Sequence, residues 1–267
     1  MIGSFLNVVI LRLPRLMEHE WRQQAAEFSG QGQLPLDPPP DLVFSRSCCP
    51  QCGHQITAFE NIPLFSYLWL GGKCSGCGRR ISFQYPLVEF VTAVLSAIVA
   101  YHFGFTLAAA GALVMTWSLV ALSVIDIREQ LLPDAITLPL LWIGLLLNVG
   151  AVYTELSSAV IGAALGYLSL WLVYHGFKLL TGKEGMGYGD FKLLAAFGAW
   201  LGWQSLPLII LLSSLVGGVV GVGMILLGGK DRNIPIPFGP YIAAAGWISM
   251  IWGEQIIGTY LRVSGLG

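Results

Sequence analysis

Long apolar segments follow one another through most of this chain, and they constrain its fold more than any other feature. Over 267 residues, 55% are hydrophobic and 11% are charged, and the mean hydropathy is +0.70, which does not suit the polar surface of a soluble domain. A membrane helix needs about 20 predominantly apolar residues. From Leu87 onward, such segments lie near residues 88–103, 105–125, 135–153, 156–178, 191–205, 207–228 and 238–261.

A shorter apolar run, Met1 to Leu13, opens the chain and stops where Arg12, Pro14 and Arg15 cluster. Thirteen helical residues cover about 20 Å, against roughly 30 Å of hydrocarbon, so we expect half a helix or a native start upstream of Met1. The run lacks the basic start and small-residue cleavage site of a signal peptide. Together with the later segments, it predicts an all-α polytopic membrane protein with about eight transmembrane helices.

Charged residues divide the chain into parts. Of fourteen Lys and Arg residues, seven lie between Arg12 and Arg80, in and around the only long polar segment. This bias predicts that the polar segment is cytoplasmic. We therefore expect a first membrane helix over 1–13, a small cytoplasmic domain over 14–87 and a membrane domain over 88–267. A net charge of −1 without a basic patch argues against a nucleic-acid partner.

The later connections alternate in charge. Those near 102–104, 153–157 and 203–207 contain no Lys or Arg, whereas those near 128, 178–183 and 230–232 do. Eight crossings with both chain ends outside satisfy this pattern. This topology places Asp126 at the cytoplasmic end of the third helix and Asp190 at the cytoplasmic start of the sixth.

Within the polar segment, Cys49 and Cys52 form one Cys-x-x-Cys-Gly knuckle, and Cys74 and Cys77 form a second, with 21 residues between the pairs. Four thiolates in two such pairs are the soft tetrahedral ligand set that zinc prefers, and four protein ligands leave no position for a catalytic water. The pattern predicts a structural zinc site. Disulfides or free thiols are the alternative, although a reducing cytoplasm disfavours disulfides. The fifth cysteine, Cys48, is either a free thiol or a competing ligand.

Two aspartates stand out at the ends of apolar segments. Asp190 follows a glycine-broken loop in the stretch GMGYGDFKLL, and Asp126 ends the apolar run from Phe105 to Ile125. An intramembrane carboxylate is costly and often functional, although Asp190 could instead cap its helix. Two acids at one depth could share a proton if their helix ends meet, as in aspartic proteases, which are the standard example of this chemistry.

Such a pair supports water activation. One ionised carboxylate would take a proton from water while the other, protonated, polarises a carbonyl, with no covalent intermediate. The alternative use of the two acids is cation binding or proton relay in a transporter or channel, and a non-catalytic assembly factor is a third possibility. No internal repeat supports a transporter.

Several motifs together carry a family resemblance. GSFLNVVILRLP, the paired knuckles, ENIPLFSYL, DIREQLLPD, GMGYGDFKLL and FGPYIAAAGW occur in this order, and together they resemble the type IV prepilin leader peptidases. The resemblance implies a GxGD-type intramembrane aspartyl peptidase of the bacterial inner membrane, with Asp126 and Asp190 as its catalytic pair. Its active site and large loop would face the cytoplasm.

The same resemblance implies substrates and a second activity. The substrates would be prepilins of type IV pili or pseudopilins of type II secretion, each with a short basic leader that stays in the cytoplasm. Members are often bifunctional and methylate the new N-terminus from S-adenosylmethionine. Glu60 and Lys73 are candidates for methyl transfer by this resemblance alone. We expect cleavage and methyl transfer to be separable, with cleavage in the helices after Leu87.

Overall fold

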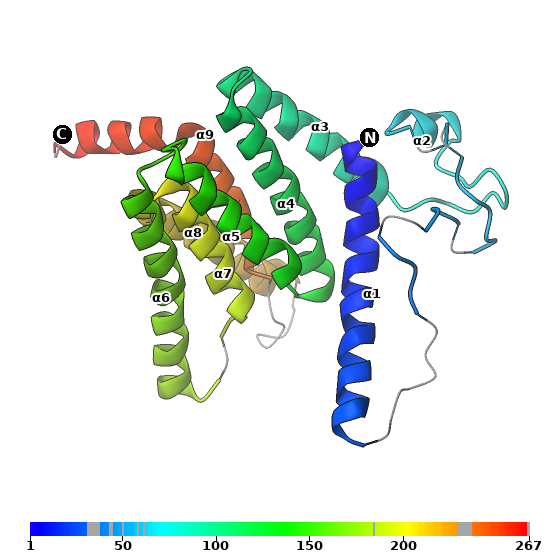
Figure 1. Ribbon diagram of the computed structural model, residues 1–267, viewed down its shortest axis with the longest axis horizontal. Coiled ribbons are helices and arrows are strands. Elements are labelled where there is room, and N and C mark those ends of the chain that lie inside the picture. The colour runs from blue at the N-terminus through cyan, green and yellow to red at the C-terminus, as the bar shows by residue number, and fades with distance from the viewer. Residues whose placement is uncertain are drawn as a thin grey trace. The chain divides into compact units, whose positions relative to one another are not determined.

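In a computed structural model of the chain, the described residues are 1–30, 38–42, 45–49, 51–57, 59–60, 62–183, 185–228 and 237–265 (Figure 1). Lys230 and Arg232, used in the charge pattern above, lie outside them. The chain forms two compact units, an N-terminal unit of Met1–Ile98 and a C-terminal unit of Val99–Gly267. Within the described ranges the regular structure is helical, with only two isolated β-bridges. The predicted all-α fold is confirmed.

The N-terminal unit contains α1 (Ile2–Phe28), α2 (Phe65–Trp69) and the first part of α3 (Gln84–Phe103). The sequence predicted that the first helix would stop near Leu13, but α1 continues through Pro14 to Phe28. The residues after Pro14 are mostly good helix formers, and an Arg22–Glu18 ion pair of 2.5 Å joins two successive turns. The end of the apolar pattern marked a change of surroundings rather than the end of the helix.

The first turns of α1 and α3 are in direct contact. A Cβ on Gly3 would lie 2.7 Å from the Cα of Glu89, so only glycine permits this approach. The buried Asn7 donates from Nδ2 to the carbonyl oxygen of Tyr85 at 3.1 Å. Because Gly3 meets Glu89 and Asn7 meets Tyr85, the two helices run antiparallel where they touch.

The C-terminal unit contains the later predicted segments as helices. In chain order they are α4 (Leu107–Glu129), α5 (Asp134–Val149), α6 (Leu156–Thr181), α7 (Tyr188–Leu201), the short 3₁₀ helix η1 (Trp203–Ser205), α8 (Leu206–Gly228) and α9 (Gly239–Ser264). Among the described residues, four helical stretches are long and apolar enough to cross a membrane: Gln84–Phe103, Leu107–Glu129, Leu156–Thr181 and Trp203–Met224. The protein is a membrane protein, while the count of eight crossings stays a prediction.

Helix α7 is the core of the C-terminal unit, and every residue from Leu193 to Trp200 is buried. Neighbouring helices approach it through glycines at which a Cβ would come within 2.4 Å of α7. These contacts are Gly144 of α5 against Trp200, Gly162 of α6 against Gly198, and Gly246 of α9 against Phe197. A helix that is buried all round has fixed neighbours, so the residues at its start are held in place as well.

Candidate active site and metal site

Asp126 lies in the last turn of α4 and is only 6% exposed. Its Oδ2 atom accepts a hydrogen bond of 3.0 Å from the backbone N–H of Gly239, the first residue of α9. The first N–H groups of a helix have no partner within the helix and suit an anionic acceptor. The start of α9 therefore fixes the position of the Asp126 carboxylate.

Asp190 is the third residue of α7 and is 5% exposed. Gly187 is the N-cap of this helix, so the alternative in which Asp190 caps it is wrong: the glycine-rich loop ends earlier than the apolar pattern indicated. Among the described residues, Oδ1 of Asp190 is buried and has no hydrogen-bond partner. Because buried polar atoms are nearly always paired, the unpaired carboxylate oxygen makes Asp190 a candidate for chemistry or binding.

The fold brings the helix ends that carry Asp126 and Asp190 together around one side chain, that of Leu132. Leu132, in the connection between α4 and α5, packs against the first turns of α7 and α9. A Cβ on Gly189 would lie 2.7 Å from Leu132 Cβ, and a Cβ on Gly239 would lie 3.1 Å from Leu132 Cδ1. Leu132 belongs to the motif DIREQLLPD, Gly189 to GMGYGDFKLL and Gly239 to FGPYIAAAGW. These three motifs therefore meet at Leu132, and the sequence alone had indicated no role for the last of them.

An ion pair ties α5 to α7 beside this site. Lys192 Nζ lies 2.7 Å from both carboxylate oxygens of Asp134, the first residue of α5. Both side chains are partly solvent-exposed, so the pair adds only about 0–1 kcal/mol to the free energy of unfolding. The ion pair matters mainly for position, because Lys192 is two residues after Asp190. By holding Lys192, Asp134 anchors the first turns of α7.

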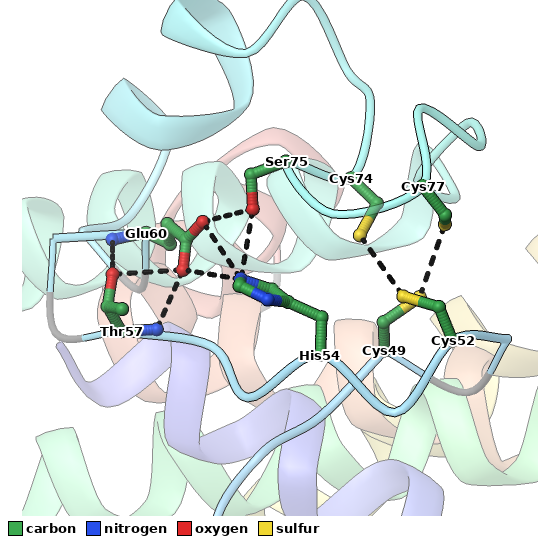
Figure 2. Close-up of polar contacts among 8 residues, drawn as sticks. All are labelled: Cys49, Cys52, His54, Thr57, Glu60, Cys74, Ser75 and Cys77. Carbon is green, nitrogen blue, oxygen red and sulfur yellow. Dashed lines mark hydrogen bonds and ion pairs between the residues drawn. The ribbon is translucent and has the colours of Figure 1, made fainter.

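The four knuckle cysteines form one cluster in the N-terminal unit (Figure 2). Their sulfur atoms all lie within 4.8 Å of one another, with 3.9 Å between Cys49 and Cys77 and 4.0 Å between Cys52 and Cys74. Four sulfurs placed tetrahedrally about 2.3 Å from one ion lie about 3.8 Å apart, so the cluster could hold a metal ion. The same separations are far too long for disulfides, and all the cysteines are free.

The two knuckles share one backbone shape. In each, the glycine after the second cysteine has positive φ, 70° at Gly53 and 69° at Gly78, and its N–H donates to the carbonyl oxygen of the first cysteine. Backbone hydrogen bonds from Gln51 and then Cys52 lower the pKa of Cys49 to about 6, whereas burial and the neighbouring thiols raise the pKa of Cys52 to about 12. Cys48 lies outside the cluster.

Glu60 connects the two knuckles (Figure 2). Its Oε2 accepts hydrogen bonds from the backbone N–H and the hydroxyl of Thr57 at 2.8 and 2.9 Å. Its Oε1 accepts one from Ser75, between Cys74 and Cys77, and His54 Nε2 lies 3.4 Å from both oxygens. The Ser75 hydroxyl and then Thr57 lower the pKa of Glu60 to about 2. A carboxylate has about four lone-pair sites, and these donors occupy them.

The structure does not join the two methyl-transfer candidates. Lys73 is exposed, and no hydrogen bond or ion pair between Glu60 and Lys73 occurs in the described part of the chain. The backbone of Lys73 instead forms an isolated antiparallel β-bridge with Arg80, on the other side of the second knuckle. Sequence reasoning missed the roles of Gly239, Leu132 and Lys192, because their contacts are with residues distant in the chain.

Comparison with known proteins agrees with the resemblance of the motifs. Residues 113–222 match the type IV leader peptidase family, and residues 1–103 match the bacterial peptidase A24 N-terminal domain. No solved structure matches significantly.

Among curated proteins, the chain is similar to several named prepilin leader peptidase/N-methyltransferase. That of Pseudomonas aeruginosa is 57% identical over 265 residues, which are 99% of this chain and 91% of the relative. Those of Aeromonas hydrophila and Aeromonas salmonicida are 57% and 58% identical over 262 and 263 residues, in each case 98% of this chain and 90% of the relative. With both halves matched and identity above one half over nearly the whole length, this chain belongs to the type IV leader peptidase family.

Proposed function

We propose that this protein cleaves the basic leader from type IV prepilins or type II secretion pseudopilins at the cytoplasmic face of the inner membrane, and then methylates the new N-terminus. Its family and relatives favour this activity over the transporter that two intramembrane acids alone left open. The observation that carries the catalytic assignment is the meeting of two buried carboxylates, Asp126 and Asp190, with one oxygen of Asp190 unpaired.

The proposed cleavage uses these two side chains and one water molecule. The ionised aspartate takes a proton from water as its oxygen attacks the scissile carbonyl carbon, and the protonated aspartate donates a hydrogen bond to the carbonyl oxygen. Collapse of the tetrahedral intermediate breaks the C–N bond, and the leaving nitrogen takes up the proton that the first aspartate accepted from water. Gly239 holds one oxygen of Asp126, whereas the unpaired Oδ1 of Asp190 is free to face substrate or water.

The direct test is isosteric substitution of each aspartate. Asp126→Asn and Asp190→Asn should each abolish cleavage of a synthetic prepilin segment by purified protein, while the variants stay folded in the membrane. Glu155→Gln, at an exposed residue before α6, is the control and should cleave at the parent rate. Cleavage at the parent rate by either aspartate variant would remove that residue from the mechanism.

We further propose that the metal held by Cys49, Cys52, Cys74 and Cys77 is one structural zinc ion. The sulfur separations suit zinc, and four protein ligands complete its tetrahedron. Elemental analysis of protein purified without added metal should give about one zinc per chain. Cys48→Ser, the control, should keep that zinc and Cys74→Ser should lose it; metal-free parent protein with four freely alkylated thiols would contradict the site.

S-adenosylmethionine is the proposed methyl donor, and we place methyl transfer in the N-terminal unit. The contacts of Glu60 favour a role in holding the knuckles together, since its acceptor sites are filled, and Lys73 keeps its side chain accessible. Variants of the knuckle cysteines should therefore lose methylation more than cleavage, because metal binding and folding of the knuckles are coupled. Mass spectrometry of the product N-terminus reads both steps, and equal loss of both would show that the two units act as one.

A further inference from the structure

The short helix α2 exposes an apolar face that no described residue of the N-terminal unit covers. Phe65, Leu68 and Trp69 are 73%, 78% and 86% exposed, and their spacing places them on one side of the helix. The intervening Tyr67 points the other way: a Cβ on Gly72 would lie 3.0 Å from its ring. The three largest apolar side chains of α2 therefore point away from the unit that carries it.

The position of α2 is fixed against the start of a membrane helix. Leu64, its N-cap, donates from its backbone N–H to Oε2 of Glu89 at 2.9 Å. Glu89 is the sixth residue of α3, so it lies only about 8 Å above the first residue of that helix. Leu64 has φ of 61°, a conformation that needs support from its surroundings, and this hydrogen bond supplies it. Leu87 and Phe90, at the same level of α3, are also exposed apolar residues.

We propose that α2 is an interfacial helix, and that its Phe65–Leu68–Trp69 face lies among the lipid headgroups and upper acyl chains of the bilayer. The hydrogen bond from Leu64 ties α2 to the first turns of α3, a helix apolar enough to cross a membrane, on which Leu87 and Phe90 are exposed. Tryptophan and phenylalanine are enriched at this depth, because the rings are apolar and the indole N–H can reach water. A short amphipathic segment anchored to the membrane helix needs no partner protein to bury its apolar face.

The N-terminal unit also contains a second tryptophan, Trp21, which serves as a reference for a position outside the membrane. Helix α1 is antiparallel to α3 where Asn7 meets Tyr85, so beyond Asn7 it continues away from the membrane-crossing part of α3. Trp21 lies fourteen residues further along α1, or about 21 Å. It is half exposed and should be surrounded by water.

The test measures the environments of these two tryptophans in the full-length protein in phosphatidylethanolamine and phosphatidylglycerol vesicles. The chain has nine tryptophans, so the fluorescence of a single one is obtained by difference. The contribution of Trp69 is the intensity that the parent protein has and the Trp69→Phe variant lacks, and Trp21→Phe gives the contribution of Trp21 in the same way. The quenchers are lipids with bromine atoms near the carbonyl region and, in water, acrylamide. The Trp69 contribution should lose most of its intensity to brominated lipid and little to acrylamide, and the Trp21 contribution should do the reverse.

Two outcomes overturn the proposal. If acrylamide quenches the Trp69 contribution as strongly as that of Trp21, the α2 face is in water. If neither quencher affects it, a protein surface, from elsewhere in the chain or from a second copy, covers the face instead of lipid. Both variants should retain prepilin cleavage, which shows that either result belongs to the folded enzyme.

Discussion

Replacing Gly239 with alanine should disable the enzyme by displacing Asp126, although residue 239 has no reactive group. The added Cβ would lie 2.7 Å from Asp126 Oδ2, and ordinary contacts begin at 3.4 Å, so the carboxylate or α9 must move by about 0.7 Å. The new methyl group is also crowded on a second side, because Leu132 Cδ1 and Cδ2 would both lie 3.1 Å from it.

The expected effect falls mainly on kcat. Overpacking of this size costs about 1–3 kcal/mol of stability, and a misplacement of about 1 Å at a reacting group can reduce the rate up to about 100-fold. We therefore expect Gly239→Ala to cleave prepilin about 10- to 100-fold more slowly, with KM changed less than kcat, since the displaced carboxylate acts mainly in the transition state.

Steady-state cleavage of a synthetic prepilin segment, paired with thermal unfolding in detergent, measures both effects. Gly258→Ala is the matched control, because it lies in the same helix and a Cβ there meets nothing within 4 Å. It should cleave at the parent rate and unfold at the same or a higher temperature, since alanine favours a helix over glycine. If Gly239→Ala keeps the parent kcat, the contact between α9 and Asp126 does not position the catalytic group, and the reasoning from the geometry is refuted.

Other substitutions test the rest of the structure. Asp134→Asn should weaken the ion pair beside α7 and lower the cleavage rate several-fold while changing the free energy of unfolding by less than about 1 kcal/mol; a large loss of stability would contradict its exposed setting. Gly162→Ala should destabilise the protein by about 1–3 kcal/mol, because its Cβ would lie 2.4 Å from the backbone oxygen of Gly198, whereas Gly176→Ala on the same helix meets nothing and should not. Glu60→Gln should speed metal loss to a chelator without slowing cleavage; unchanged metal retention combined with lost methylation would return Glu60 to the methyl-transfer site.

The sequence by itself determined the class of fold, most helix positions and the cysteine cluster, and it singled out Asp126 and Asp190 as catalytic candidates. Apolar segments of membrane-crossing length leave few folds other than helices, because backbone polar groups in lipid must be paired within the segment. The predicted segment near 156–178 is the helix Leu156–Thr181, and the one near 207–228 is Leu206–Gly228. The paired knuckles indicated one metal cluster because ligand spacing is a local property of the chain.

Only the tertiary structure decided what surrounds each of these residues. The apolar pattern stopped at Leu13, yet α1 continues to Phe28, because helix propensity persists where hydrophobicity does not. The contact of Gly239 with Asp126 joins residues 113 positions apart, and no local pattern contains that distance. The same is true of Leu132 between the first turns of α7 and α9 and of Glu60 between two knuckles. The periodicity and spacing of residues in the sequence describe neighbours along the chain. The neighbours of a residue in space are determined by how the helices pack.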